Sequence, residues 1–140
     1  MIVLDTNVVS ELMRPAPDAQ VVGWIRRQAA EELRTTAITL AEIVYGIEQL
    51  PEGRRRDLLR RTANEVFESF EEQVLPFDGP AAVRYGAIVD ARDRIGRPID
   101  GFDAQIAAIC RDRDAPLATR NVTGFEHTGV AVVDPWREAS

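Results

Sequence analysis

The sequence predicts an α/β fold in which a doubly wound, mostly parallel sheet is flanked by helices. Short apolar runs rich in β-branched residues alternate with longer segments of helical periodicity, which is the order typical of this class. The first run, residues 2–4, is apolar at consecutive positions, as expected for a strand buried on both faces in the middle of a parallel sheet. The length of 140 residues suits one domain, so we expect a single domain over residues 1–140.

The elements that follow the first strand are short. Residues 8–13 read as a helix that ends before the prolines at 15 and 17. Asp18 is a suitable N-cap for a second helix, because apolar residues follow it at helical spacing. Residues 33–37 read as the second strand.

Two longer helices are predicted between residues 39 and 70. Residues 39–50 carry apolar side chains at helical spacing until Pro51 interrupts the pattern. Residues 54–70 repeat apolar positions with the same period and predict an amphipathic helix. Residues 74–77 read as a short strand or an extended link.

Two further helices and two strands complete the prediction. Residues 80–94 and 102–113 read as helices, and the second is the most apolar of all, so we expect it to be the most buried. The remaining segments are assigned as loops at 96–101 and 121–129 and as strands at 116–119 and 130–133.

Composition favours a globular protein without a membrane span. No apolar run approaches the ~20 residues that a bilayer requires, and no export signal is apparent, so we expect a cytoplasmic location. The single cysteine, Cys110, lies in an apolar helical segment and is expected to be a core residue. The net charge is −6, with 23 acidic residues against 17 arginines and no lysine, which does not by itself favour nucleic-acid binding.

Three carboxylates occur where a strand or loop is followed by a helix. Asp5 follows the first strand, Glu42 lies near the start of the helix at 39–50, and Asp103 lies near the start of the helix at 102–113. In open α/β sheets the crevice beyond the carboxyl ends of the strands is the usual site of chemistry. We therefore expect these three side chains to share one pocket.

Each of these acids also has a purely structural interpretation. Asp5 is a good N-cap, and the segment from Thr39 to Glu42 has the Thr-x-x-Glu pattern of a capping box. Asp103 is favoured near a helix N-terminus by the helix dipole, and Asp100 is a suitable N-cap for the same helix. If the three acids do converge, their mutual repulsion predicts a hard divalent cation such as Mg²⁺ between them.

Four segments, in order and at the expected separations, resemble the PIN-domain family and especially its VapC and FitB ribonuclease toxins. They are the opening Met-Ile-Val-Leu-Asp-Thr-Asn, the Thr-x-x-Glu helix start at 39–42, the Pro-Ile-x-x-Phe-Asp-Ala-Gln-Ile-Ala-Ala run at 98–108, and Leu-Ala-Thr-Arg-Asn at 117–121. The resemblance covers essentially the whole chain and implies a PIN-like α/β fold.

The resemblance also implies roles for individual residues. It assigns Asp5, Glu42 and Asp103 as ligands of Mg²⁺ or Mn²⁺ and Thr119 as a group that supports a ligand or positions a water. Thr6 and Asn7 would support the site. Many members carry a fourth acid where this chain has Asn121, and a neutral amide weakens any second metal position. Asp100 could compensate, although a capping role is the stronger expectation.

The implied function is metal-dependent endonucleolytic cleavage of RNA by the toxin of a toxin–antitoxin pair. A small antitoxin would cover the groove, and the protein would form a homodimer, with the apolar helices at 40–50 and 81–89 as the expected interaction surfaces. Two other functions stay open: a non-catalytic PIN-like binding module, in which the acids only cap helices, and a metal phosphatase with small substrates.

Several other residues have both a structural and a functional interpretation. The basic run Arg54–Arg61 reads first as a solvated helix face with local ion pairs, Glu52 to Arg56 and Asp57 to Arg61, and second as a rim for RNA phosphates or for an acidic partner. Arg120 is better placed to contact substrate. The remaining residues are expected to be a surface histidine, His127, and core or interface aromatics: Trp24, Tyr45, Tyr85 and, packed on the body of the domain, Trp136.

Overall fold

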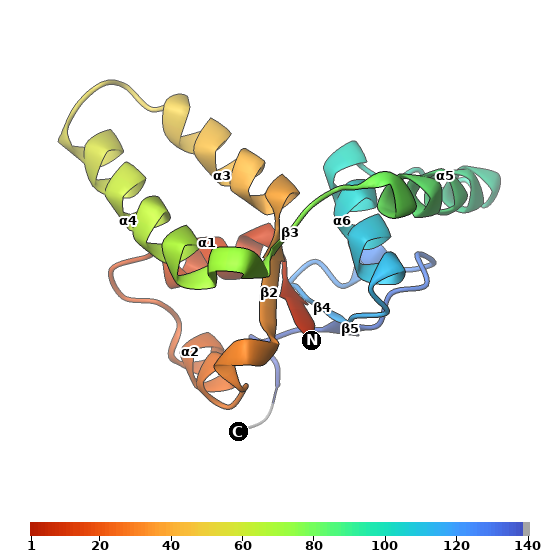
Figure 1. Ribbon diagram of the computed structural model, residues 1–140, viewed down its shortest axis with the longest axis horizontal. Helices are drawn as coiled ribbons and strands as arrows, with labels where there is room; N and C mark the ends of the chain where they lie inside the picture. Colours follow the sequence, from red (N-terminus) through yellow and green to blue (C-terminus); the bar gives the residue numbers. More distant parts are fainter. Residues whose placement is uncertain (139–140) are drawn as a thin grey trace.

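The computed structural model describes residues 1–138 and has a five-stranded sheet with helices on both faces (Figure 1). The strand order is β3-β2-β1-β4-β5, and every pairing is parallel. The strands are β1 (Ile2–Leu4), β2 (Leu33–Thr36), β3 (Val74–Leu75), β4 (Leu117–Ala118) and β5 (Val132–Val133). The predicted fold class and the central position of the first strand are confirmed.

The helices connect the strands in chain order. They are α1 (Thr6–Leu12), α2 (Ala19–Arg26), α3 (Ala37–Glu48), α4 (Arg54–Phe70), α5 (Gly79–Arg94) and α6 (Gly101–Asp112), with short 3₁₀ helices η1 (Ala30–Glu32), η2 (Glu71–Gln73) and η3 (Thr123–Phe125). No helix among residues 1–138 is long and apolar enough to cross a bilayer.

The hydrophobic core consists of two layers, one on each face of the sheet. Consecutive strand residues point to opposite faces, so Val3 packs into one layer and Leu4 into the other. The layer containing Val3 lies under α5 and α6, and the layer containing Leu4 lies under α1 to α4. In Figure 1 the α3–α4 hairpin and the α5–α6 pair accordingly extend on opposite sides of the central strands.

The most apolar predicted helix is also the most buried. Six residues of α6 are buried, and the fully inaccessible Cys110 is one of them. Burial raises the pKa of the Cys110 thiol, which disfavours the reactive thiolate. The expectation that Cys110 is a core residue is confirmed.

Boundaries were predicted less well than the elements themselves. Helix α1 begins at Thr6 instead of residue 8, because Asp5 acts as its N-cap and accepts a hydrogen bond from the Thr6 amide. Strands β3, β4 and β5 are each two residues long, shorter than predicted. The segment at 121–129, predicted as a loop, contains the 3₁₀ helix η3.

The aromatic residues divide between core and surface. Trp24 is 5% exposed and belongs to the core, whereas Tyr45 is 64% exposed on α3. Tyr85 packs edge-on against Phe77, with ring centroids 6.0 Å apart. Trp136 packs against the layer under α1 to α4, as predicted.

Candidate active site

The predicted carboxylates line one pocket at the carboxyl end of the sheet. Asp5 caps α1, Asp103 lies in the first turn of α6 and Glu42 lies in the middle of α3, and their side chains border a pocket of about 600 Å³. The other lining residues are Thr6, Asn7, Ser10, Glu11, Arg14, Arg120, Asn121 and Trp136. Strand ends and helix starts that are far apart in sequence thus meet here, as expected for an open parallel sheet.

Asp5 is the most deeply placed of the three carboxylates. Its side chain is 4% exposed. Oδ1 accepts the Thr6 amide at 2.8 Å and caps α1, while Oδ2 accepts the Thr119 hydroxyl at 2.7 Å. Burial raises the pKa of Asp5, and these two hydrogen bonds oppose that rise. The capping interpretation of Asp5 is therefore correct, and the same carboxylate also borders the pocket.

The hydroxyl of Thr119 makes all of its hydrogen bonds with other groups of the protein. Its fully buried hydroxyl donates to Asp5 and accepts two N–H groups, one from the Asn7 side chain at 3.1 Å and one from the Asn121 backbone at 3.0 Å. A hydroxyl has one hydrogen and two lone pairs, so all are used. The geometry therefore favours support of the Asp5 carboxylate over positioning of a water.

Glu42 does not form the capping box that the sequence suggested. The N-cap of α3 is Thr36, whose hydroxyl accepts the Thr39 amide at 3.1 Å, so the helix begins earlier than predicted. The Glu42 carboxylate instead accepts a 2.9 Å hydrogen bond from the hydroxyl of Thr6. Burial, with a contribution from the negative charge of Asp5, raises the pKa of Glu42. The structural explanation of Glu42 as a capping residue is wrong.

Among the three carboxylates, Asp103 has the pKa that is shifted furthest from its ordinary value. Asp100 caps α6 by accepting the amides of Phe102 and Asp103, at 2.9 Å and 3.3 Å, which confirms its predicted role. Burial raises the pKa of Asp103 to about 6, and the charges of Asp5, Asp100 and Glu42 add to the effect. Repulsion between acids from different elements therefore adds to burial in raising the pKa of Asp103.

The pocket suits a hard divalent cation in its donor chemistry. Partly desolvated carboxylate oxygens that repel one another are the ligands that Mg²⁺ and Mn²⁺ prefer. Among residues 1–138, however, no three His, Cys, Asp or Glu side chains are grouped closely enough to enclose a metal ion. The carboxylates share a pocket but do not converge as tightly as the sequence suggested. Mg²⁺ usually keeps several waters and needs only one or two direct carboxylates, so this spacing is compatible with a hydrated ion.

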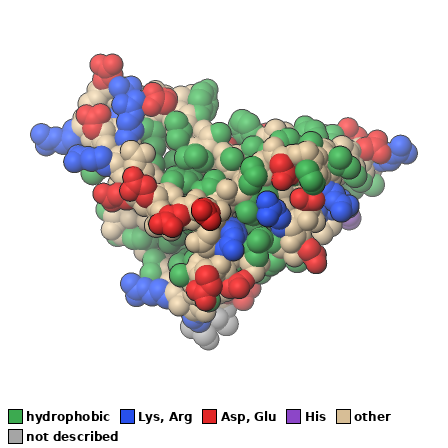
Figure 2. All heavy atoms as spheres, viewed as in Figure 1, with side chains coloured by type: hydrophobic (Ala, Val, Ile, Leu, Met, Phe, Trp, Pro, Cys, Tyr) green, Lys and Arg blue, Asp and Glu red, His purple; other side chains and the backbone are tan. Residues whose placement is uncertain are grey.

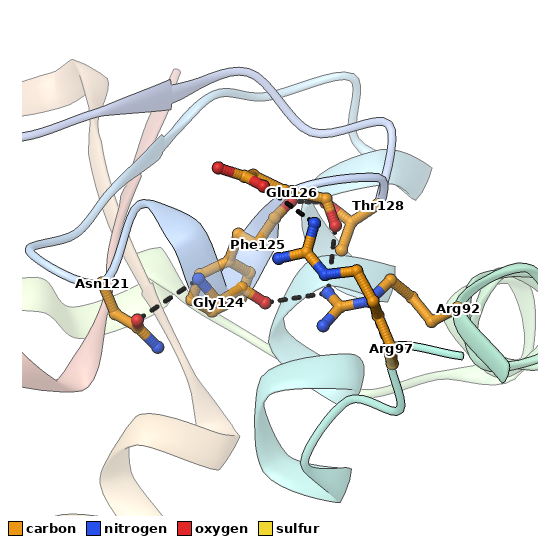
Figure 3. Close-up of polar contacts among 7 residues, drawn as sticks. All are labelled: Arg92, Arg97, Asn121, Gly124, Phe125, Glu126 and Thr128. Atoms are coloured by element: carbon orange, nitrogen blue, oxygen red, sulfur yellow. Dashed lines mark hydrogen bonds and ion pairs between the residues drawn. The ribbon is translucent and has the colours of Figure 1, made fainter. Parts of the chain in front are cut away.

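Asn121 lies at the exposed edge of the pocket and is held by the turn that follows it. Its Oδ1 accepts the Gly124 amide at 3.3 Å (Figure 3). A Cβ at position 124 would lie 2.2 Å from the Asn121 side-chain nitrogen, so any larger residue there would force the Asn121 side chain to move.

A buried arginine fixes this turn from behind. Arg92 of α5 is 5% exposed and donates to the backbone carbonyls of Arg97, Gly124 and Glu126, at 2.6, 2.9 and 3.0 Å (Figure 3). Arg97 also pairs with the Glu126 carboxylate at 2.9 Å. The positive charge of Arg92 lowers the pKa of Asp103 slightly, against the larger effects of burial and of the acids. Arg92 thus joins the loop before α6 to the turn that holds Asn121.

Sequence reasoning missed Arg92 and a second buried charge, Glu11. An arginine on an amphipathic helix looks the same whether it faces solvent or the core, so no local signal marked Arg92. Glu11 is 7% exposed, lines the pocket and accepts the Asp18 amide at 2.9 Å. The only local signal for the burial of Glu11 is its position as a single acid shortly before Pro15 and Pro17.

The basic run on α4 lies outside the carboxylate pocket. Arg56 pairs with Glu52 at 3.7 Å as predicted, while Arg60 pairs with Glu48 of α3 at 2.6 Å. No ion pair between Asp57 and Arg61 is present in the described part of the chain, so that predicted pair is wrong. The prediction that His127 is a surface residue is confirmed, and Arg120, predicted to contact substrate, lines the pocket.

An apolar groove continues from the pocket between α1, α3 and α4. It has a volume of about 620 Å³ and shares Thr6, Ser10, Arg14 and Glu42 with the carboxylate pocket. Exposed hydrophobic side chains also occur on α3 and α5, where Tyr45 is 64% and Val83 75% exposed. Figure 2 shows hydrophobic side chains mainly in the upper half of one face, while acidic and basic side chains lie at its outer ends and across its lower half.

Comparisons with known proteins agree with this architecture. The PIN domain family matches residues 2–130. VapC ribonuclease Y4jK of Sinorhizobium fredii is 39% identical over 140 residues, covering 99% of this chain and 100% of the relative. Toxin FitB of Neisseria gonorrhoeae is 36% identical over 139 residues, with the same coverage.

Solved structures give the same result. The crystal structure of FitAcB from Neisseria gonorrhoeae matches with a TM-score of 0.91 at 36% identity, covering 99% of this chain and 100% of that chain. The structure of FitAB bound to an IR36 DNA fragment also gives a TM-score of 0.91, at 35% identity and 100% coverage of this chain. The resemblance noted in the sequence is confirmed, and the chain belongs to the PIN-domain family.

Proposed function

We propose that this protein is a metal-dependent endoribonuclease that hydrolyses RNA phosphodiester bonds and serves as the toxin of a toxin–antitoxin pair. The observation that most supports the proposal is the pocket bordered by Asp5, Glu42 and Asp103, in which the pKa of all three acids is raised. Perturbed acids gathered in one pocket are typical of catalytic sites. Relatives named VapC ribonuclease and tRNA(fMet)-specific endonuclease VapC support the same reaction class.

A Mg²⁺ or Mn²⁺ ion would be held by Asp5 and Asp103, with Glu42 as a third ligand directly or through water. When bound, such an ion supplies an activated water and stabilises the negative charge on the phosphate. The chain's own contribution is to fix the acids in place. Thr119 and the Thr6 amide orient Asp5, and the Thr6 hydroxyl orients Glu42.

Asp103 and Arg120 have further proposed roles, in proton transfer and in substrate binding. In the metal-free protein the pKa of Asp103 is raised to about 6, so among the three acids it is the one that most readily accepts a proton near neutral pH. The exposed Arg120 lines the pocket and offers a positive charge to an RNA phosphate. Although the whole chain has a net charge of −6, this edge of the pocket therefore carries a positive side chain.

The proposed protein partner is a small antitoxin bound along the apolar groove between α1, α3 and α4. The groove shares residues with the carboxylate pocket, so an occupant would also obstruct the site. The FitAcB and FitAB structures and the toxin named FitB support a role in such a pair. Homodimerisation through exposed side chains of α3 and α5, and a cytoplasmic location, belong to the same proposal.

The test is an RNA cleavage assay with purified protein. Single-stranded and stem-loop RNA would be incubated with Mn²⁺ or Mg²⁺, with EDTA as the metal-free control. Asp5→Asn should reduce cleavage by more than about 100-fold, because loss of a residue that merely supports a ligand already costs about 10–100-fold. Asn caps helices as well as Asp does, so the variant keeps its cap on α1.

A matched control separates catalysis from folding. Asp78 caps α5 by accepting the Ala81 amide at 3.1 Å and lies outside the pocket, so Asp78→Asn should cleave like the wild type. Cleavage by Asp5→Asn at the rate of Asp78→Asn would contradict the assignment of Asp5. Absence of metal-dependent cleavage in the wild type would favour the non-catalytic binding module, in which these acids only cap helices. Hydrolysis of a generic phosphate monoester without RNA cleavage would favour the small-substrate phosphatase.

A further inference from the structure

A second cavity adjoins the carboxylate pocket. It has a volume of about 800 Å³, within the range of about 300–1,000 Å³ that is usual for small-molecule sites. Arg120 and Trp136 line both cavities and therefore separate them. The other lining residues are Asp18, Val122, Thr123, Asp134 and Arg137.

The sheet brings Arg120 and Trp136 together from distant parts of the chain. Parallel pairing places Ala118 opposite Val133, and the Thr119 amide donates to the Val133 carbonyl at 2.8 Å. The two segments then leave adjacent strands at the same edge of the sheet. The guanidinium carbon of Arg120 lies 4.9 Å from the centroid of the Trp136 ring, which is cation–π distance.

The two residues of this pair differ in how firmly they are held. Trp136 packs against the core layer under α1 to α4, and its amide donates to Asp134 at 2.9 Å. The Arg120 side chain is exposed, while its amide donates to the Asn7 side chain at 3.2 Å. The indole is thus a fixed surface, and the guanidinium is a cation that can adjust to a ligand.

The second cavity is lined by two carboxylates and two guanidinium groups, so it has no net positive charge to attract a phosphate. Asp18 caps α2, and Asp134 pairs with Arg137 at 3.8 Å, so both carboxylates are held at the cavity wall. Negative oxygens repel phosphate but accept hydrogen bonds from the amino groups of bases. An aromatic ring, a guanidinium and carboxylate acceptors together suit a nucleobase, since unpaired bases stack on aromatic side chains and on Arg.

We propose that this cavity binds the nucleobase next to the scissile phosphate, held against the Arg120–Trp136 pair. The inference rests on the proposed ribonuclease function and adds a base-binding subsite to it. With the phosphate at the carboxylates, the neighbouring nucleotide passes Arg120 and places its base in the second cavity. The preferred substrate is therefore unpaired RNA, because a base held in a duplex cannot reach this surface.

The test uses tryptophan fluorescence in an Asp5→Asn background. The chain has two tryptophans, and Trp24 is 5% exposed in the core. A Trp24→Phe protein therefore reports on Trp136 alone, and a Trp136→Phe protein reports on Trp24 alone. The probes are a single-stranded RNA hexamer and the same sugar–phosphate backbone made entirely of abasic nucleotides.

We expect the hexamer to quench Trp136 in a saturable manner and to leave Trp24 unchanged. The abasic backbone should bind roughly tenfold more weakly and give no quenching, because stacking is lost. Arg120→Ala should weaken hexamer binding, whereas Arg84→Ala, an exposed arginine on α5, should not. In the active protein, Trp136→Ala should raise KM for RNA about tenfold with kcat unchanged.

The results distinguish this subsite from the ribonuclease proposal. Equal affinity for the hexamer and the abasic backbone, or no quenching of Trp136, overturns the subsite even if the wild type cleaves RNA. Saturable quenching that depends on the bases, together with a wild type that does not cleave RNA, would support base binding in this cavity and overturn the nuclease proposal. Failure of every form to bind the hexamer overturns the subsite as well.

Discussion

The hydroxyl of Thr119 donates a 2.7 Å hydrogen bond to the carboxylate of Asp5, which lies 114 positions away in the chain. Both residues are buried, and both follow adjacent parallel strands, β4 and β1. The same hydroxyl accepts N–H groups from Asn7 and Asn121, so one side chain connects three pocket residues. The orientation of Asp5 therefore depends on correct pairing of the sheet.

Replacing Thr119 by Val, which keeps the shape but removes the hydroxyl, should lower kcat/KM for RNA by about 10–100-fold. The reason is that Asp5 loses a donor and its carboxylate is no longer held in one orientation. The free energy of unfolding should also fall by about 2 kcal/mol, because buried partners are left unpaired. RNA cleavage assays and urea denaturation measure the two effects separately.

Thr128 provides the control. It is also buried, and its hydroxyl donates to the Phe125 carbonyl at 2.6 Å, away from the pocket lining. Thr128→Val should lose comparable stability and retain activity. Equal activities of the two Val variants would contradict the role given to Thr119.

The raised pKa of Asp103 predicts how stability depends on pH in metal-free protein. The ordinary value is 3.8, and the folded value is about 6. Between these values the folded state retains a proton that the unfolded state releases, so the contribution of Asp103 to stability is complete below about pH 4. It is lost as the pH rises toward 6 and stays lost above. Asp5 and Glu42, whose pKa values are also raised, change stability in the same direction.

Asp103→Asn should therefore melt at a higher temperature than the wild type above pH 6 in EDTA, and the difference should shrink toward pH 4. Above pH 6, excess Mn²⁺ should raise the Tm of the wild type, because the ion binds the folded state. The Tm of Asp103→Asn should rise less, because that variant lacks one of the proposed ligands. Asp57→Asn, on the exposed face of α4, serves as the control. Parallel pH profiles of Asp103→Asn and the wild type would contradict the assignment.

The neutral side chain at position 121 predicts one tightly bound ion in the free protein. Asn121 can offer an oxygen or hold a water but adds no negative charge to the pocket. Asn121→Asp keeps the acceptor for the Gly124 amide and adds a charge, so we expect a second bound Mn²⁺ in that variant alone. Equilibrium dialysis with Mn²⁺ counts the ions, and two tight sites in the wild type would contradict the prediction.

Local sequence patterns were sufficient to predict the fold and the general position of the site. The apolar run at 2–4 and the carboxylate after it are local features, and both were assigned correctly, with β1 at the centre of the sheet. The helix at 54–70 was also predicted within its observed bounds because its apolar period is regular. Patterns of this kind depend only on neighbouring residues.

Features that depend on distant residues could not be predicted in the same way. The pattern from Thr39 to Glu42 matched a capping box, but Thr36 caps α3 and Glu42 bonds to Thr6 instead. Which of two threonines caps a helix is decided by where strand β2 ends, which packing determines. Likewise, the contact of Arg120 with Trp136 follows from strand register, and no local pattern contains that information.

The burial of Arg92 leads to the last prediction. Its guanidinium donates to three backbone carbonyls in two separate segments, so Arg92→Ala would leave buried acceptors unpaired and should destabilise the protein by about 3 kcal/mol. Arg92→Lys should recover part of this loss, since an ammonium keeps the charge but cannot reproduce the planar arrangement of donors. Hydrogen exchange at residues 121–129 should accelerate in both variants, because the turn that holds Asn121 is released.

Arg94 of the same helix is the matched control for Arg92. It is exposed and pairs with Asp90 at 2.7 Å one helical turn away. Exposed pairs of this kind contribute little, so Arg94→Ala should leave both the unfolding midpoint and the exchange of residues 121–129 unchanged. Urea denaturation and hydrogen exchange would show whether the two arginines differ. Similar losses in both Ala variants would mean that helix α5 as a whole, and not the guanidinium of Arg92, stabilises the turn beside the pocket.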